Sequence, residues 1–209
     1  IGLIYSPWGK RSGAHLNPAV TLTFYRLGKI GGIDACSYVM AQFFGGALGL
    51  WLVSRAIGKA VEHPAVNYVV TTPGPAGSGT AFVAEALISF GLMLVVLMVS
   101  NTTSLNAWTG CVAGALVATY IAIEAPLSGM SMNPARTLAS AALAAEWRTI
   151  WIYFVAPPLG MLVAGELYAR GLRSRAQACA KLHHVAGYRC IFCEHAARRA
   201  RRTSTARGH

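Results

Sequence analysis

An eleven-residue segment that occurs twice places the strongest constraint on the fold of this chain. Residues 12–22 and 128–138 are identical at seven of eleven positions, and both contain the tripeptide Asn-Pro-Ala. A long-period repeat of this kind indicates a duplicated structural unit. We therefore expect two copies of one structural arrangement, separated by 116 residues.

The composition indicates that this arrangement lies in a membrane. Hydrophobic residues make up 55% of the chain and charged residues 12%, and the mean hydropathy is +0.47. These values exclude an ordinary soluble domain of this size. Four apolar stretches come close to the roughly 20 helical residues that cross a bilayer. They are residues 35–54, 80–100, 107–123 and 150–169.

The positions of these stretches predict that the first half of the repeat is incomplete. Two stretches precede the second copy of the repeat and one follows it, whereas only one follows the first copy. We therefore expect an N-terminally truncated six-span protein, with the first span and most of the second absent. An odd number of spans in each half would give the two halves opposite orientations in the membrane. The predicted divisions are a channel domain over 1–169, made of a repeat remnant 1–57, an outer loop 58–79 and a second repeat 80–169, and a tail over 170–209.

The basic residues predict which side of the membrane the tail occupies. Residues 170–209 hold ten Lys and Arg against one acid, so the net charge of +11 arises mainly in the tail. Basic residues just beyond a last span follow the positive-inside rule and contact anionic lipid head groups. We therefore expect the tail to be cytoplasmic and to bind no nucleic acid.

Each Asn-Pro-Ala turn predicts the start of a short helix. Asn is favoured as the N-cap and Pro at the first helical position. Ten helical residues would rise about 15 Å, which is half of the hydrocarbon thickness. Two such half-helices would point their N-termini at each other near the midplane. The residues concerned are Asn17, Pro18 and Ala19 in the first copy and Asn133, Pro134 and Ala135 in the second.

Paired turns of this kind suit the passage of a small uncharged molecule. The Asn carboxamide oxygen can cap its helix while the NH₂ group donates into a cavity. The two helix N-termini carry partial positive charge, which repels hydronium and metal cations. The non-helical residues 13–16 and 129–132 would expose carbonyl oxygens at membrane depth, which is tolerated only where they line a water-filled pore.

The segments SGAHLNPAVTL and SGMSMNPARTL resemble the two signature loops of the aquaporin, or major intrinsic protein, family. The resemblance covers residues 1–169 and is to members of bacterial type. It implies an all-α membrane fold with an inverted repeat and two half-helices that meet at the midplane. It also implies one pore per subunit, a homotetramer, and a location in the bacterial inner membrane. No carboxylate pair, nucleophile triad or phosphate loop points to an enzyme.

The resemblance further implies roles for individual residues. His15 corresponds to the pore histidine on the cytoplasmic side, and Arg136 to the arginine of the outer constriction. Ile121 and Met130 stand at two more constriction positions. Independently of the family, an arginine buried in a membrane is costly enough to suggest a function.

Two polar residues within the apolar stretches are expected to support the loops. Glu85 resembles the family's glutamate that braces the second loop through backbone N–H groups, and Gln42 resembles a similar brace in the first half. Ordinary hydrogen bonding between helices is the alternative for both residues.

The sequence leaves three functions open. Water-selective members carry a histidine where this chain has Ile121, so the aliphatic side chain favours a facilitator for glycerol or a metalloid hydroxide. Thr137, which stands in place of an aspartate, and the aromatic pair Tyr153 and Phe154 favour a water channel instead. A non-conducting structural member of the same fold is the third alternative.

The tail carries a group of metal-binding residue types, although the channel itself requires no cofactor. Cys190 and Cys193 have the spacing of a zinc-knuckle pair. Together with Cys179 and either His183 or His184 they would complete a tetrahedral zinc site. The alternative is a flexible basic tail whose thiols are incidental.

Overall fold

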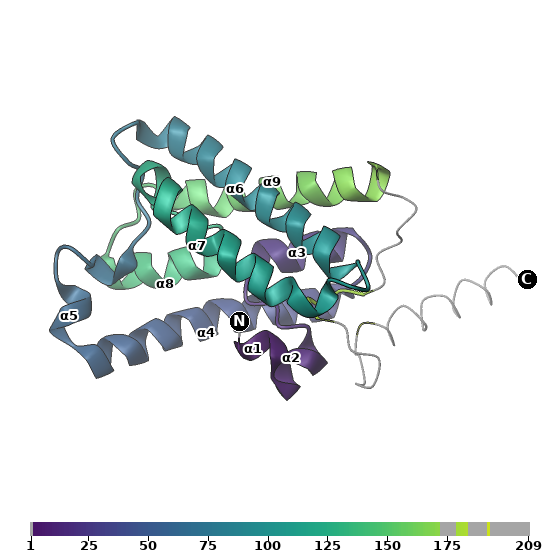
Figure 1. Ribbon diagram of the computed structural model, residues 1–209. Helices are drawn as coiled ribbons and strands as arrows, with labels where there is room; N and C mark the ends of the chain where they lie inside the picture. The colour runs from purple at the N-terminus through teal and green to yellow at the C-terminus, as the bar shows by residue number, and fades with distance from the viewer. Residues whose placement is uncertain (1, 172–178, 184–191, 193–209) are drawn as a thin grey trace, which may run out of the picture.

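The computed structural model describes residues 2–171, 179–183 and 192, and every regular element in these residues is a helix (Figure 1). The first half contains α1 (Gly2–Tyr5), α2 (Pro7–Ser12), the half-length α3 (Pro18–Arg26) and the long α4 (Gly32–Ile57). The short α5 (Lys59–Glu62) and the 3-10 turn η1 (Asn67–Val69) follow. The second half consists of α6 (Gly77–Ser100), the 3-10 turn η2 (Asn106–Trp108), α7 (Thr109–Ser128), the half-length α8 (Pro134–Ala144) and α9 (Ile150–Gly171).

Four helices, α4, α6, α7 with η2, and α9, are long and apolar enough to cross a membrane. They coincide with the four predicted stretches, which confirms the all-α membrane fold. The boundaries differ by a few residues, most at the end of α7, where the apolar run stops at Ile123 but the helix continues through Pro126 to Ser128. Proline is tolerated in a membrane helix where neighbouring groups satisfy the backbone that it frees.

The half-length helices lie among the long ones and come from opposite ends of the bundle (Figure 1). α8 packs mainly on α4, and α3 packs mainly on α9. The most extensive helix contact is between α6 and α9. A Cβ atom added at Gly160 of α9 would lie 2.1 Å from the carbonyl oxygen of Ala86, so only glycine allows these two backbones to approach so closely. Small residues have this use in membrane bundles.

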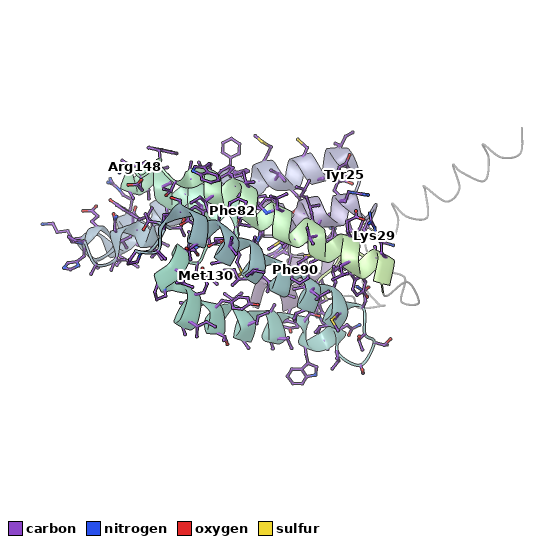
Figure 2. All side chains as sticks on the ribbon, turned by 90° about the horizontal axis from the view of Figure 1, so that it is seen from above. Tyr25, Lys29, Phe82, Phe90, Met130 and Arg148 are labelled. Carbon is purple, nitrogen blue, oxygen red and sulfur yellow. The ribbon has the colours of Figure 1, made fainter. Side chains whose placement is uncertain are left out.

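The two ends of the bundle differ in the residues that they carry. Figure 2 shows Tyr25 and Lys29 at one end and Arg148 at the other. At the first end, Arg26 of α3 forms a 2.7 Å ion pair with Glu166, which also lies 3.3 Å from Arg170. This ion-pair network brings the end of α3 next to the end of α9, so the basic residues of the first repeat and the start of the tail share one side.

Candidate pore at the paired Asn-Pro-Ala turns

The two half-helices begin at the predicted residues and by the predicted capping contacts. Asn17 and Asn133 have extended backbone conformations, with φ of −141° and −145°, and each is followed by a proline at the first helical position. Their Oδ1 atoms accept hydrogen bonds from the N–H groups of Ala19 at 2.9 Å and Ala135 at 3.0 Å. Each asparagine therefore satisfies a backbone donor that an uncapped helix would leave free.

The same two asparagines also join the turns to each other. Asn17 Nδ2 donates to the Met132 carbonyl oxygen at 2.7 Å, and Asn133 Nδ2 donates to the Leu16 carbonyl oxygen at 2.9 Å. Leu16 and Met132 are equivalent positions of the repeat, so the contact is reciprocal. One N–H of each amide is engaged across the junction and the other remains. The sequence interpretation assigned both N–H groups to the cavity and did not foresee this mutual contact.

The loops that lead into the half-helices adopt the same backbone shape. Gly13 and Gly129 end α2 and α7 in the left-handed region, at φ of 80° and 78°. The next residues, Ala14 and Met130, also have positive φ, at 56° and 48°. Positive φ is uncommon outside glycine, so both loops hold a conformation that the surroundings must stabilise.

Side chains of α4 stabilise the first loop. Gln42 Nε2 donates to the His15 carbonyl oxygen and to Thr21 Oγ1, both at 2.9 Å. The Tyr38 hydroxyl donates to the Ser12 carbonyl oxygen at 2.7 Å. Gln42 thus contacts the loop for which the sequence proposed it as a brace.

A fully buried carboxylate holds the second loop. Glu85 Oε1 accepts from the Ser131 N–H at 2.6 Å and from the Ser128 hydroxyl at 2.8 Å. Its Oε2 accepts from the Met132 N–H at 2.8 Å. The Tyr153 hydroxyl donates to the Ser128 carbonyl oxygen, as Tyr38 does to the equivalent Ser12. Glu85 thus lies where the resemblance placed it.

Several of these contacts were not foreseen, although the repeat carried a signal for some of them. Thr21 and Thr137 are equivalent and buried, and each hydroxyl lies near the side chain two residues before its Asn. The Thr21 Oγ1 to His15 Nδ1 distance is 3.3 Å, and the Thr137 Oγ1 to Ser131 Oγ distance is 2.5 Å. The threonine is one of the seven identical positions, so its identity in both copies pointed to this role.

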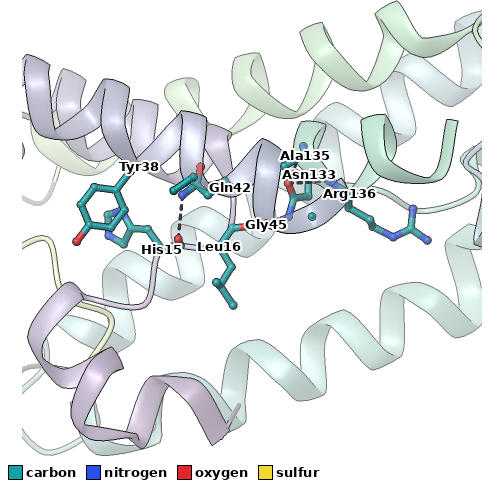
Figure 3. A pocket seen from close by; sticks show the side chains of 10 residues that line it. His15, Leu16, Tyr38, Gln42, Gly45, Asn133, Ala135 and Arg136 are labelled. Atoms are coloured by element: carbon teal, nitrogen blue, oxygen red, sulfur yellow. Dashed lines mark hydrogen bonds between the residues drawn. The ribbon is translucent and has the colours of Figure 1, made fainter. Parts of the chain in front are cut away.

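Two cavities adjoin the meeting point of the half-helices. One, of about 490 Å³, is lined by residues of the first loop, α4 and the start of α8. Figure 3 shows its length, with His15 and Tyr38 at one end, Asn133 further along and Arg136 at the far end. The other, of about 390 Å³, includes Asn17 and residues of α6, α7 and the second loop. Asn133 and Arg136 line both cavities.

The three predicted constriction residues share the second cavity. Ile121, Met130 and Arg136 all line it, although Ile121 is 55% exposed and Met130 only 5%. Arg136 Nη2 lies 3.4 Å from the Val69 carbonyl oxygen, which the left-handed turn η1 presents. Its Nη1 is buried and has no hydrogen-bond partner among the described residues.

The proposed zinc site cannot be assembled from the described residues. They contain no group of three or more His, Cys, Asp and Glu side chains suited to a metal ion. Cys179 and His183 belong to the described residues, but His184, Cys190 and Cys193 lie outside them. The zinc site stays a prediction from the sequence.

Apolar membrane-length helices around two half-helices that meet head to head define a helical membrane protein built from an inverted repeat. The profile of the Major intrinsic protein family matches residues 1–168. The chain belongs to this family, that of the aquaporins, whose members are channels and not enzymes.

Similar proteins support the same assignment. The chain is 36% identical to aquaporin NIP3-1 of Oryza sativa subsp. japonica over 162 residues, which cover 77% of this chain and 50% of that protein. It is 38% identical to aquaporin NIP6-1 of Arabidopsis thaliana over 161 residues, which cover 77% of this chain and 51% of that protein. The chain thus spans about half the length of these curated relatives. Both are plant proteins, so they do not support the predicted bacterial inner membrane.

A solved structure shows the same fold. The aquaglyceroporin from Plasmodium falciparum matches with a TM-score of 0.64 and 23% identity, over 78% of this chain and 74% of that chain. This likeness concerns the arrangement of helices and carries no information on the solute.

Proposed function

We propose that this chain forms the pore-bearing part of a transmembrane channel for water and other small uncharged molecules. The observation that carries the proposal is the reciprocal contact of Asn17 and Asn133 with the carbonyl groups of Met132 and Leu16. It leaves one amide N–H of each turn beside the two cavities, where each can donate to a passing oxygen atom. The channel unit is residues 1–169, and residues 170–209 form its cytoplasmic tail.

Positive charge beside the junction of the two half-helices explains why cations should be excluded. α3 and α8 direct their N-termini at the junction, and each terminus carries roughly half a positive charge. Arg136 adds a full positive charge to both cavities. A cation that enters would lose its hydration without gaining an anionic partner, whereas a neutral molecule meets no such barrier.

A facilitator for glycerol-like solutes or metalloid hydroxides is the second candidate. The specific observation in its favour is that Ile121 and Met130 present aliphatic walls to the cavity that contains Arg136. A wall of this kind accepts the carbon skeleton of a polyol while the guanidinium binds its hydroxyl groups. The position of Thr137 favours water as the solute, because this buried side chain lines neither cavity. Its hydroxyl oxygen lies 3.1 Å from that of Thr71.

The chain is proposed to act as a homotetramer in the membrane. α4 is apolar and almost entirely exposed within the described residues, and Phe44, Leu48 and Trp51 are among its exposed side chains. Such a face requires lipid, another helix or a second copy to cover it.

Light scattering of proteoliposomes tests the pore. Water permeability should fall in Asn17→Ala and Asn133→Ala, since each change removes a helix cap worth about 1 kcal/mol and one half of the junction. Asn106→Ala, at the start of the 3-10 turn η2 and away from the junction, should match the wild type. Wild-type permeability in both junction variants would contradict the pore assignment. A folded protein that passes no solute would support the non-conducting alternative, and swelling in glycerol or boric acid separates the two channel candidates.

A further inference from the structure

The described part of the C-terminal tail packs onto the first Asn-Pro-Ala loop. Ala180 is fully buried, and the Ala180 carbonyl oxygen lies 2.7 Å from His15 Nε2. Because a carbonyl oxygen only accepts, Nε2 carries the proton of this hydrogen bond. The Leu182 N–H also donates to the Gly13 carbonyl oxygen at 3.5 Å. The tail is thus joined to the loop at two points, His15 and Gly13.

An aromatic side chain of the tail completes this contact. Phe192 is 3% exposed, and its ring stacks on His15 with a centroid distance of 5.6 Å and lies 6.0 Å from the ring of Tyr38. A Cβ atom at Gly13 would lie 2.6 Å from the Phe192 ring, so a side chain at residue 13 would require the ring to shift. The rings of His15 and Tyr38 form one end of the larger cavity, as Figure 3 shows. Phe192 therefore lies against the two rings that form that end.

We propose that this tail contact, formed by residues 179–183 and 192, is an autoinhibitory plug that closes the pore at His15. The proposal rests on the channel function proposed above. It assigns to the tail a closed state in which the Ala180 carbonyl occupies the imidazole N–H that a permeating molecule would otherwise meet. Opening requires the tail to leave the loop.

A buried charge makes this closed state easy to leave. Lys181 is 2% exposed, and its Nζ atom has no hydrogen-bond partner among the described residues. An unpaired buried ammonium group destabilises the state that buries it. Release of the tail would return Lys181 to water or to anionic lipid head groups, which attract basic segments. The stacking of Phe192 therefore favours the closed state, whereas the return of Lys181 to water favours the open state.

A labelling experiment measures the contact without reference to transport. Cys179 is buried, and trypsin releases it in the peptide 176–181, which contains no other cysteine. In phosphatidylcholine proteoliposomes, maleimide should modify this peptide slowly in the wild type and quickly in Phe192→Ala. Loss of the ring contacts should lower the closed-to-open ratio roughly tenfold, which corresponds to about 1.4 kcal/mol. Trp8→Ala, which removes an exposed aromatic ring, is the control and should label like the wild type.

Water permeability of the same vesicles measures the consequence. Phe192→Ala should raise it, and Lys181→Met should lower it, because an apolar side chain of similar length removes the buried charge and favours closure. Equal labelling of Cys179 in the wild type and Phe192→Ala would overturn the contact. Faster labelling with unchanged permeability, in vesicles that do conduct water, would overturn the closure alone. Absence of conduction in all variants, Phe192→Ala included, would contradict the proposed channel function and the plug with it.

Discussion

Each asparagine of the repeat uses one side chain for two tasks. Its Oδ1 atom caps the half-helix that it begins, and its Nδ2 atom holds the loop of the other repeat. An aspartate could cap but could not donate, and a serine would be too short to reach the opposite carbonyl group. The pairing of both tasks explains why the same residue type stands at Asn17 and Asn133.

Glu85 provides a sharp test of how the second loop is held. The two carboxylate oxygens of Glu85 accept hydrogen bonds from the Ser131 and Met132 N–H groups. In Glu85→Gln, an amide NH₂ would replace one of these oxygens and would face a backbone N–H donor. Because buried donors would lose their acceptor, the free energy of unfolding should fall by about 1–3 kcal/mol. Thermal unfolding followed by circular dichroism measures the change. Glu62→Gln, at an exposed position, should have no effect. Equal stability of the two variants would show that Glu85 is not a brace.

The half-helices show that a short helix is stable in a membrane when its N-terminus is satisfied by the opposite loop and its sides by long helices. α3 lies against α9, and α8 lies against α4. A Cβ atom at Gly165 of α9 would lie 2.8 Å from the Thr23 side chain, so close approach also supports the contact of α3. The position of each half-helix depends on the tight packing of the long helices around it.

Close approach of α6 and α9 yields a prediction on stability. Gly160→Ala should destabilise the protein by about 1–3 kcal/mol, because the added Cβ atom must displace the backbone at Ala86. Gly79→Ala, at a helical position with open space, should leave stability unchanged or raise it slightly, since alanine favours the helix. Detergent-solubilised melting temperatures compare the two variants. A loss in Gly79→Ala equal to that in Gly160→Ala would show that helix backbone conformation, not packing, is responsible.

Local rules and the repeat were sufficient to predict the helix starts at Pro18 and Pro134 and the four spans. Capping depends on adjacent residues, and a span depends on a continuous apolar run, so both are visible in sequence. The hydroxyl contacts of Tyr38 and Tyr153 could not be predicted, because they depend on how each long helix is rotated. The burial of Phe192 was missed for a similar reason, since a basic tail gives no sign of a docking partner.

The two repeats differ in how much of their last helix is covered by the rest of the bundle. α4 and α9 hold equivalent places after the two half-helices, yet nearly half of α9 is buried and α4 is almost entirely exposed. The difference arises because α6 covers α9, whereas no described helix covers α4 in the same way. The uncovered face of α4 is where the assembled protein must supply a partner or lipid.

The predicted orientation of α6, which starts outside and ends inside, predicts opposite labelling of the two loops that flank it. In a background without the native cysteines, Ala65→Cys should react with an impermeant maleimide from outside intact cells, and Ser104→Cys only after permeabilisation. Both positions are exposed, and they lie at opposite ends of α6. Labelling of both from the same side would contradict the orientation of the spans.

A cysteine placed in the proposed pathway would test whether molecules pass between the two turns. Leu16 lines the larger cavity beside Asn133, whereas Leu52 of α4 is comparably exposed and lines neither cavity. With the native cysteines replaced, a methanethiosulfonate reagent should reduce water permeability in Leu16→Cys, reversibly with dithiothreitol, and leave Leu52→Cys unaffected. Unchanged permeability of the modified Leu16→Cys protein, or equal loss in both variants, would contradict a pore at the paired Asn-Pro-Ala turns.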